Sequence, residues 1–286
     1  MLKRVDGTRT VEEGVWKQNA WDKIEWSEDM FQDAISKINI HKENPAINPD
    51  LFHSNPAKYW DKFYQNNQDS FFKDRHWISA EFPLLFERIK NHQKDSVFQF
   101  IDLGCGVGNT IYPLLRATID TNILFHGADY SINAINVLKT HELYDKSRIN
   151  AFVYDITSPE FPISLANSLD VVSCVFVLSA LHPNQHIQAV NNIYNMLKPG
   201  GIVLLRDYGR YDLAQVRMKK NRFIDDNFYI RGDGTRVYFF SLEDVLVLFQ
   251  DRFKVIQNTT RNELIVNRKL LLKMYRCWLQ CCYEKI

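Results

Sequence analysis

The sequence predicts an α/β fold built on a doubly wound sheet, and three observations predict it. Apolar, β-rich runs alternate with helical patterns from Val97 to about residue 208. The first run ends in glycines at alternate positions, Gly104, Gly106 and Gly108. The fourth run, residues 169–182, is continuously apolar, as expected for a central parallel strand covered on both faces. Right-handed strand–helix units of this kind make a Rossmann-like sheet whose ligand lies beyond the carboxyl ends of the strands.

Composition places the chain among globular proteins. It has 286 residues, of which 45% are hydrophobic, and a formal net charge of +1, so any surface for nucleic acid must be local. No apolar run is long enough to cross a bilayer, which predicts that the chain does not associate with a membrane. Five cysteines at irregular spacing and the lack of a hydrophobic signal core predict a reducing compartment, the cytoplasm.

Residues 1–56 are predicted to form an N-terminal arm and linker. The stretch is polar and turn-rich, carries Trp16, Trp21 and Trp26, and ends in a segment with two prolines, residues 41–50. The tryptophans either anchor the arm on the main domain or contact RNA or a partner, and both readings stay open.

Residues 57–95 are predicted to form a helical segment that binds RNA and covers the cofactor. Trp60 and Tyr64 are four residues apart, so they share one helix face. The stretch SFFKDRHW, Ser70 to Trp77, then interleaves aromatic and basic side chains. This composition suits a flipped base and its flanking phosphates, or else an aromatic cap on the core with solvated charges.

The stretch from Val97 to Asn109, VFQFIDLGCGVGN, is a strand that ends in a glycine loop and leads into a helix. Glycines let the backbone approach a ligand, and the first helical amides face it. A dinucleotide fingerprint needs its third glycine where this chain has Asn109. Here Asp102 is followed at alternate positions by Gly104, Gly106 and Gly108. This is the acidic GxGxG motif of S-adenosylmethionine (SAM) methyltransferases.

The next strands end in residues suited to the same ligand. The run 122–129 ends at Asp129, which can accept hydrogen bonds from both ribose hydroxyls of an adenosine. After a helix capped by Ser131, the run 149–155 ends at Asp155, where its carboxylate or the Ile156 amide could meet the adenine amino edge. The fourth strand ends near Val175. Together these positions predict SAM as the cofactor and a seven-stranded class I methyltransferase domain over residues 96–286.

The end of the chain completes the predicted sheet. A helix over 184–197 leads to a fifth strand over 201–209, and then residues 207–240 break the pattern with many Arg, Lys and Tyr residues. We predict an inserted substrate lobe there, with a solvated charged face as the alternative. A helix from Ser241 to Arg252 and a closing hairpin follow. The cysteines at 277, 281 and 282 lie in this hairpin without ligand spacing, so no metal site is predicted.

Several motifs resemble the tRNA 3-methylcytidine methyltransferases, which methylate N3 of cytosine 32 in the anticodon loop. They are WDKFY, FFKDRHW, GCGVGN, FVLSALHP, RDYGRYD and NFYIRGDGTRVYFF, and they extend the match from about Trp16 to the C-terminus. The segment QNAWDKIEW resembles the subgroup that acts on threonine tRNAs. The resemblance implies that SAM is contacted by Trp60, Tyr64, Gly104, Asp129, Asp155, Ile156 and Val175. The glycine loop adds Gly106 to this predicted set. It also implies that the Ser70–Trp77 stretch and the lobe contact the substrate. The predicted residues of the stretch are Phe71, Phe72, Lys73, Arg75 and His76, and those of the lobe are Arg210, Arg231 and Arg236.

The chemistry of this family needs placement more than a base. Cytosine N3 carries an in-plane lone pair and the product is a cation, so the site must align the reactants and tolerate positive charge. We predict that Asp207 faces the pyrimidine and that Arg206 and Tyr208 fix the flipped base. A structural ion pair between Arg206 and Asp207 is the alternative.

Other reactions fit less well. Methylation of an exocyclic amine usually requires a [DN]-P-P-[YF] motif after the fourth strand, where this chain has Phe176-Val177-Leu178-Ser179. Methylation at cytosine C5 needs a cysteine nucleophile, and neither Cys105 nor Cys174 has a suitable context. A small-molecule or protein methyltransferase and a non-catalytic RNA-binding subunit stay as alternatives. The expected partners are tRNA and an aminoacyl-tRNA synthetase or another tRNA-binding protein, with the chain itself a monomer.

Overall fold

The structure is a computed structural model that describes residues 4–6, 14–93 and 95–286. Residues 1–3 and 7–13 of the expected arm, and residue 94, lie outside the described residues. The described helices are α1 (Glu28–Lys42), α2 (Asp50–His53), α3 (Pro56–Asn67), α4 (Ile78–Glu81), α5 (Pro83–Lys90), α6 (Ile111–Ala117), α7 (Ile132–Lys139), α8 (His186–Met196), α9 (Leu213–Val216) and α10 (Leu242–Phe249). Short 3₁₀ helices are η1 (Val15–Lys17), η2 (Ile163–Leu165), η3 (Leu178–Ala180) and η4 (Pro183–Gln185). No described helix is both long and apolar enough to span a bilayer.

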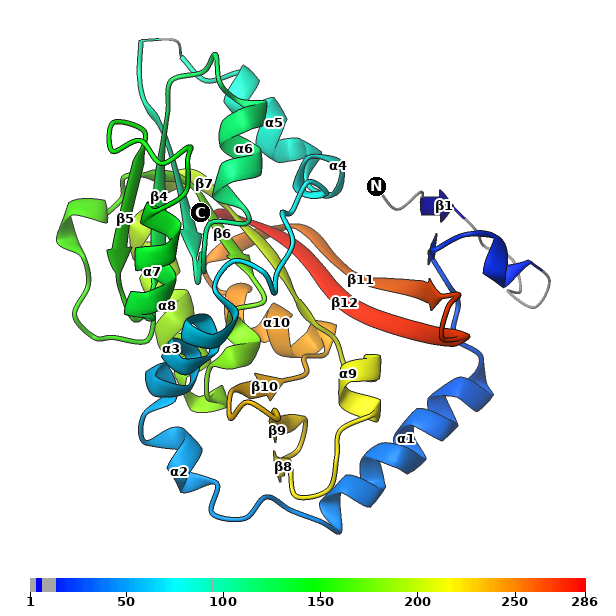
Figure 1. Cartoon of the computed structure of the whole chain (residues 1–286). Helices are drawn as coiled ribbons and strands as arrows, with labels where there is room; N and C mark the ends of the chain where they lie inside the picture. The colour runs from blue at the N-terminus through cyan, green and yellow to red at the C-terminus, as the bar shows by residue number, and fades with distance from the viewer. Residues whose placement is uncertain (1–3, 7–13, 94) are drawn as a thin grey trace.

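A nine-stranded sheet with the strand order β1-β2-β11-β12-β7-β6-β3-β4-β5 forms the centre of the molecule (Figure 1). Its strands are β1 (Arg4–Asp6), β2 (Ala20–Asp22), β3 (Phe98–Leu103), β4 (Ile123–Asp129), β5 (Ile149–Val153), β6 (Leu169–Val175), β7 (Leu197–Tyr208), β11 (Phe253–Asn267) and β12 (Leu272–Lys285). Strands β3 to β7 pair in parallel, and the β11–β12 hairpin joins β7 antiparallel. The predicted seven strands are therefore confirmed, in the order expected for a doubly wound sheet.

The N-terminal arm differs from the sequence expectation. β2 pairs antiparallel with β11 and β1 pairs with β2, so the arm extends the predicted sheet at its edge. The turn-rich reading is also wrong for α1, whose N-cap Ser27 accepts a hydrogen bond from Met30 N and whose first turn holds Glu28 and Asp29. This helix was missed because it has few buried residues, and hence no strong apolar stripe.

The tryptophans of the arm that pack on β11 and β12 act as anchors. Trp21 joins a small apolar cluster with Leu264 and Val266, and its indole NH donates to Val15 O at 3.1 Å. Trp26 makes an edge contact with Tyr275 at 6.3 Å between ring centroids. Trp16 is 37% exposed.

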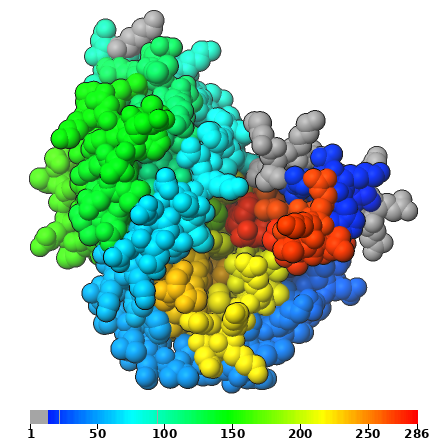
Figure 2. Space-filling view, viewed as in Figure 1, coloured from blue at the N-terminus to red at the C-terminus, as the bar shows by residue number. Residues whose placement is uncertain are grey.

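The segment after β7 forms a separate small lobe. It holds α9 and a three-stranded sheet of β8 (Phe223–Asp225), β9 (Phe228–Ile230) and β10 (Arg236–Tyr238) in the order β10-β9-β8. The linker after α1 contacts it, because Ala46 N donates to Phe223 O at 2.6 Å. Figure 2 shows the yellow-to-orange lobe between the blue α1 on the right and the light blue α2–α3 region on the left. The lobe is thus an ordered insertion at the edge of the domain.

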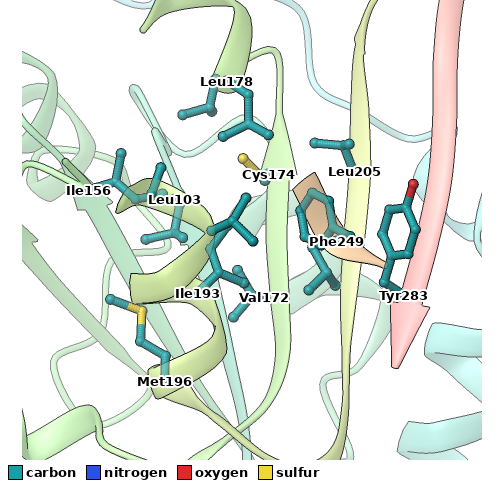
Figure 3. Packing of buried hydrophobic residues seen from close by; sticks show 14 of the residues in the cluster. Leu103, Ile156, Val172, Cys174, Leu178, Ile193, Met196, Leu205, Phe249 and Tyr283 are labelled. Carbon is teal, nitrogen blue, oxygen red and sulfur yellow. The ribbon is translucent and has the colours of Figure 1, made fainter. Parts of the chain in front are cut away.

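Two apolar layers cover the sheet. One packs α8 and α10 against side chains such as Leu103, Val172 and Leu205 (Figure 3). The other packs α4 to α7 on the opposite face, around Phe100 and Phe125. Burial of β3 and β6 on both faces explains their nearly continuous apolar runs and fixes the edge at which the glycine loop emerges.

Candidate active site

The glycine loop between β3 and α6 has a backbone that only glycine tolerates well. Gly104, Gly106 and Gly108 have φ angles of +60°, +54° and +93°. A Cβ atom at Gly104 would lie 2.5 Å from Val177 Cγ2, and one at Gly106 would lie 2.6 Å from Tyr64 Oη. The loop therefore leaves no room for side chains at these glycines and brings its main chain to the surface of a pocket.

Asp129 at the end of β4 is fastened to this loop. Its Oδ2 accepts a hydrogen bond from Gly106 N at 2.9 Å, and its Oδ1 accepts one from Ser131 N at 2.9 Å. Burial raises the pKa of Asp129 to about 6, while these two hydrogen bonds favour the ionised form. The group is thus an ionised carboxylate at pH 7.

The predicted cofactor residues all line one pocket at the carboxyl ends of the parallel strands. The predicted members are Trp60, Tyr64, Gly104, Gly106, Asp129, Asp155, Ile156 and Val175. The four residues predicted at or near strand ends, Gly104, Asp129, Asp155 and Val175, therefore line one pocket.

Side chains from α3 and from the loop after β5 form the walls of this pocket. The rings of Trp60 and Tyr64 lie 6.2 Å apart between centroids, and burial raises the pKa of Tyr64 far enough that its hydroxyl stays protonated. Asp155 Oδ1 accepts hydrogen bonds from the amide and hydroxyl of Thr157, at 2.8 and 2.7 Å. Ile156 O accepts a hydrogen bond from Asn192 Nδ2 at 2.6 Å, which fixes the backbone beside Asp155.

These residues fit SAM. The Asp129 carboxylate can accept hydrogen bonds from a ribose diol, and the close main-chain approach at Gly104 and Gly106 suits a ligand laid across the loop. The aromatic faces of Trp60 and Tyr64 suit a cationic ligand.

Sequence reasoning missed other residues of the pocket wall. The largest are Tyr130, Tyr154 and Phe176, and the rest include Leu103, Cys105, Asn109, Ala128, Val177, Ala180 and Leu181. Tyr130 and Phe176 directly follow the predicted strand-end residues Asp129 and Val175, so the same strand-end rule could have found them.

Asp207 lies beside this pocket near the end of β7, with no exposed surface. Its Oδ2 accepts a hydrogen bond from Ser179 N at 3.0 Å, and its Oδ1 accepts one from Tyr208 N at 2.8 Å. Burial raises the pKa of Asp207 to about 6, while its hydrogen bonds and Arg231 favour the ionised form. The carboxylate thus fixes the backbone at Ser179 and Tyr208.

An aromatic cluster joins the pocket to the lobe. Phe176 lines the pocket, and its ring lies 4.8 Å from that of Tyr208 and 6.3 Å from that of Trp278. The guanidinium of Arg231 lies 5.2 Å from the centre of the Tyr208 ring. Phe176 also has a φ of +59°, a strained conformation for a residue with a side chain and one that often marks functional sites. We call Phe176, Tyr208, Trp278 and Arg231 the aromatic cluster.

Comparison with known proteins places this geometry in a family. A family model described as "Methyltransferase domain" matches residues 101–203, which include the glycine loop and Asp129. The tRNA N(3)-methylcytidine methyltransferase trm140 of Schizosaccharomyces pombe is 44% identical over 277 residues, covering 96% of this chain and 90% of the relative. The chain belongs to the tRNA N(3)-methylcytidine methyltransferases.

Other relatives agree. The tRNA(Thr) (cytosine(32)-N(3))-methyltransferase of Saccharomyces cerevisiae is 43% identical over 283 residues, covering 96% of this chain but 44% of that longer protein. The tRNA N(3)-cytidine methyltransferase METTL2 of Danio rerio is 39% identical, covering 98% of this chain and 89% of the relative. The resemblance expected from the motifs is therefore confirmed.

Solved structures confirm the fold. A SAM-dependent methyltransferase from Anabaena variabilis aligns with a TM-score of 0.57 at 13% identity, covering 85% of this chain and 97% of that structure. A second one, from Methanosarcina mazei, aligns with a TM-score of 0.53 at 18% identity, covering 72% and 98%. The chain thus has the class I methyltransferase fold.

In this tRNA methyltransferase the Ser70–Trp77 stretch divides between two environments. Phe72 and Arg75 line the cofactor pocket, and Arg75 Nη1 donates to Thr110 Oγ1 at 2.7 Å. Phe71, Lys73 and His76 are exposed instead. Arg75 is therefore part of the wall of the cofactor pocket, and its contact with RNA stays a prediction.

The predicted arginines of the lobe also divide. Arg231 belongs to the aromatic cluster, whereas Arg210 forms an ion pair with Asp244 at 2.9 Å, in the capping box of α10. Arg236 is 4% exposed and lies in the field of Asp155 and Tyr130 at the pocket wall. Of these three, Arg231 has the position best suited to the substrate.

Arg206 departs furthest from its predicted role. It is 2% exposed, with its guanidinium 4.4 Å from the Trp77 ring and 4.6 Å from the Trp278 ring. Its ion-pair partner is Glu263, with Nη2 and Oε1 3.5 Å apart. Consecutive strand residues point to opposite faces, so Arg206 and Asp207 lead away from each other. This burial corrects the expectation that Arg206 holds the base directly, and the alternative of an Arg206–Asp207 pair gives way to Glu263.

Within the described part of the chain, no group of three or more His, Cys, Asp or Glu side chains is arranged to hold a metal ion. The cysteines are buried and unbridged. Burial raises the pKa of Cys105 and Cys174 well above the usual range, which leaves both as thiols and unsuited to attack on cytosine C6.

Proposed function

We propose that this enzyme transfers the methyl group of SAM to N3 of cytosine 32 in the anticodon loop of threonine tRNA. The names of the relatives from both yeasts support the reaction, and the name of the Saccharomyces cerevisiae relative supports the position and the tRNA. The segment QNAWDKIEW supports the same subgroup.

The observation that carries this proposal is the shared position of Phe176. Its side chain belongs both to the pocket wall and to the aromatic cluster, so an unpaired base stacked in the cluster would lie next to the cofactor. Aromatic side chains with an arginine at the edge are a common way to hold a single-stranded base. A cytosine exposes N3 only when it is unpaired, which an anticodon-loop base satisfies at low cost.

The chain's own residues need to place the base rather than to deprotonate it. SAM supplies an electrophilic methyl group on a sulfonium, and its transfer leaves the thioether and moves the positive charge to the base. The N3 lone pair is available without loss of a proton, so alignment by Phe176 and Tyr208 is the main requirement. The ionised Asp207 beside Tyr208 would stabilise the cationic product in a site of low dielectric.

The exposed face of the Ser70–Trp77 stretch is the proposed RNA contact next to this site. Phe71 is 58% exposed and lies 4.8 Å from Phe72 between ring centroids, so it is held on the pocket-lining segment while its surface is open. Lys73 and His76 are exposed on the same segment. Such cations beside an aromatic surface suit the phosphates on either side of a flipped base.

We further propose that the enzyme acts in the cytoplasm as a monomer and that a second tRNA-binding protein, such as an aminoacyl-tRNA synthetase, assists it. A net charge of +1 supports assistance, because few phosphate contacts give weak and salt-sensitive tRNA binding. Methylation assays with and without candidate partners would measure this dependence.

The function is tested with purified threonine, serine and arginine tRNAs, SAM and the protein alone. We expect 3-methylcytidine in threonine tRNA and none in a transcript in which cytosine 32 is replaced by uridine. Loss of the protein from cells should remove 3-methylcytidine at position 32. Unchanged modification in such cells, together with no activity in the assay, would contradict the proposal.

A further inference from the structure

A buried arginine connects the pocket-covering segment to the extended edge of the sheet. The guanidinium of Arg206 on β7 lies between the ring of Trp77, at 4.4 Å, and the ring of Trp278 on β12, at 4.6 Å. Arg206 is 2% exposed and Trp278 is 9% exposed. A desolvated cation between two indoles is among the stronger cation–π arrangements. Trp77 is thus held on the sheet through a charge that is itself buried.

Two ion pairs from β11 hold Arg206 and the helix that follows Trp77. Glu263, 1% exposed, pairs with Arg206 at 3.5 Å, while Arg261 pairs with Glu81 of α4 at 2.8 Å. Gln280 Nε2 also donates to Glu81 O at 2.8 Å. The helix that follows Trp77 is therefore tied to the same strands that hold Arg206.

Trp77 lies only two residues from a side chain of the cofactor pocket. Arg75 N donates to Asn109 O at 2.8 Å at the end of the glycine loop, and its guanidinium donates to Thr110 Oγ1 and to Val175 O. Ile78 N donates to Arg75 O at 3.1 Å, which makes Arg75 to Ile78 a tight turn. A shift of Trp77 would move Arg75 with it, because such a turn has little freedom.

We infer that Arg206 is a positioning residue for the cofactor site, which acts through Trp77 to hold Arg75 in the pocket wall. The main chain of Arg206 serves the other side of the pocket, since Phe176 N donates to Arg206 O at 2.7 Å. Arg206 on β7 thereby contacts two parts of the pocket wall, Arg75 through Trp77 and Phe176 through its own main chain. The inference concerns the SAM site and does not depend on which tRNA is methylated.

The test uses Arg206→Lys, which keeps the buried charge opposite Glu263 but loses the planar stacking surface, and Trp77→Leu, which removes the ring from the other side. We expect each variant to raise the Kd for SAM about tenfold, measured by calorimetry without tRNA. The double variant should show about the same tenfold loss, because the two residues act as one unit. Amide hydrogen exchange over residues 70–77 should become faster in both single variants.

Arg252→Lys is the matched control. Arg252 also lies over an aromatic ring, 5.5 Å from Tyr194, but it is exposed and does not line the pocket, so SAM affinity and exchange over 70–77 should stay at the wild-type values. Thermal unfolding checks that each variant is folded. If Arg206→Lys does not fold, the inference is tested with Trp77→Leu alone. A wild-type Kd for SAM in either folded single variant, or losses that multiply to about a hundredfold in the double, would overturn the inference. None of these readouts uses tRNA, so failure of the proposed tRNA reaction would leave them unaffected.

Discussion

The carboxylate of Asp129 is hydrogen-bonded to the backbone amide of Gly106, with 2.9 Å between Oδ2 and nitrogen. This contact joins the end of β4 to the loop after β3 before any ligand is considered. It fixes the carboxylate and a glycine of positive φ relative to each other, as a cofactor site requires.

Removal of this charge should weaken SAM binding. In Asp129→Asn the amide group can accept fewer hydrogen bonds, so we expect the Kd for SAM to rise by about ten- to a hundredfold, since a hydrogen bond to a charged group contributes about 1.5–3 kcal/mol. Calorimetry measures the change, and Asp251→Asn, an exposed residue in the turn after α10, is the control. A Kd within twofold of the wild type would argue against contact between Asp129 and the ribose.

SAM affinity should also depend on pH through Asp129. Its pKa of about 6 means that the carboxylate is ionised at pH 7 and becomes protonated as the pH falls toward 5. Ribose hydroxyls donate to the ionised form, so the Kd for SAM should rise as the pH is lowered through 6, and the slope should disappear in Asp129→Asn. The raised pKa of Asp129 affects folding in the opposite direction. The buried carboxyl binds its proton more tightly in the folded state than in the unfolded state, so its contribution to the free energy of unfolding falls as the pH rises from about 4 to 6. Equal pH slopes in wild type and variant would assign the effect to another group.

The glycine loop should not tolerate a side chain. Gly104→Ala places a methyl group within 2.5 Å of Val177 and keeps a φ of +60°, a conformation that costs an alanine about 1–2 kcal/mol. We expect a lower melting temperature and loss of SAM binding. Gly232→Ala is the control, because a Cβ there has no neighbour within 4 Å. Full SAM affinity in a folded Gly104→Ala protein would contradict the proposed path of the ligand.

Two arginines of the lobe should have separable effects. Arg231→Gln removes the cation over Tyr208, so we expect a roughly tenfold or greater loss of kcat/KM for tRNA with little change in the Kd for SAM. Arg210→Gln breaks the ion pair with Asp244 at the start of α10, so it should lower thermal stability and leave tRNA methylation near normal at moderate temperature. The opposite pattern would restore Arg210 as the substrate residue.

Lys73 should contribute to tRNA binding through a phosphate. Lys73→Ala is expected to weaken tRNA binding similarly for all tRNA sequences and to reduce the slope of log K against log salt by about one. Lys254→Ala, an equally exposed lysine on β11, should leave that slope unchanged. An unaltered slope for Lys73→Ala would mean that tRNA approaches from another face.

The positions of the cofactor residues could be predicted because they follow from local rules. A strand ending in alternate glycines has few conformations open to it, and parallel strands bring Asp129, Asp155 and Val175 to one edge. The chain therefore specifies this half of the site almost without reference to distant contacts. Tyr130 and Phe176 follow from the same rule, applied one residue further.

The substrate side could not be predicted in the same way. Scattered arginines have similar sequence surroundings, yet Arg206 is buried between indoles, Arg210 caps a helix through Asp244 and Arg231 lies over Tyr208. Their roles depend on which side chains other elements bring to them. Helix α1 was missed for a related reason, since it buries little apolar surface and its sequence carries no strong stripe.

The sequence by itself determined seven strands of the sheet, the SAM loop and the family, because these depend on residue spacing along single strands and turns. Only the tertiary structure decided the environment of each charged side chain. Arg206 and Asp207 are neighbours in the chain, but the alternation of strand residues sends one toward Trp77 and Glu263 and leaves the other bonded to the backbone of Ser179 and Tyr208. A charge is stabilised by what surrounds it in space, and that surrounding is assembled from segments far apart in the sequence.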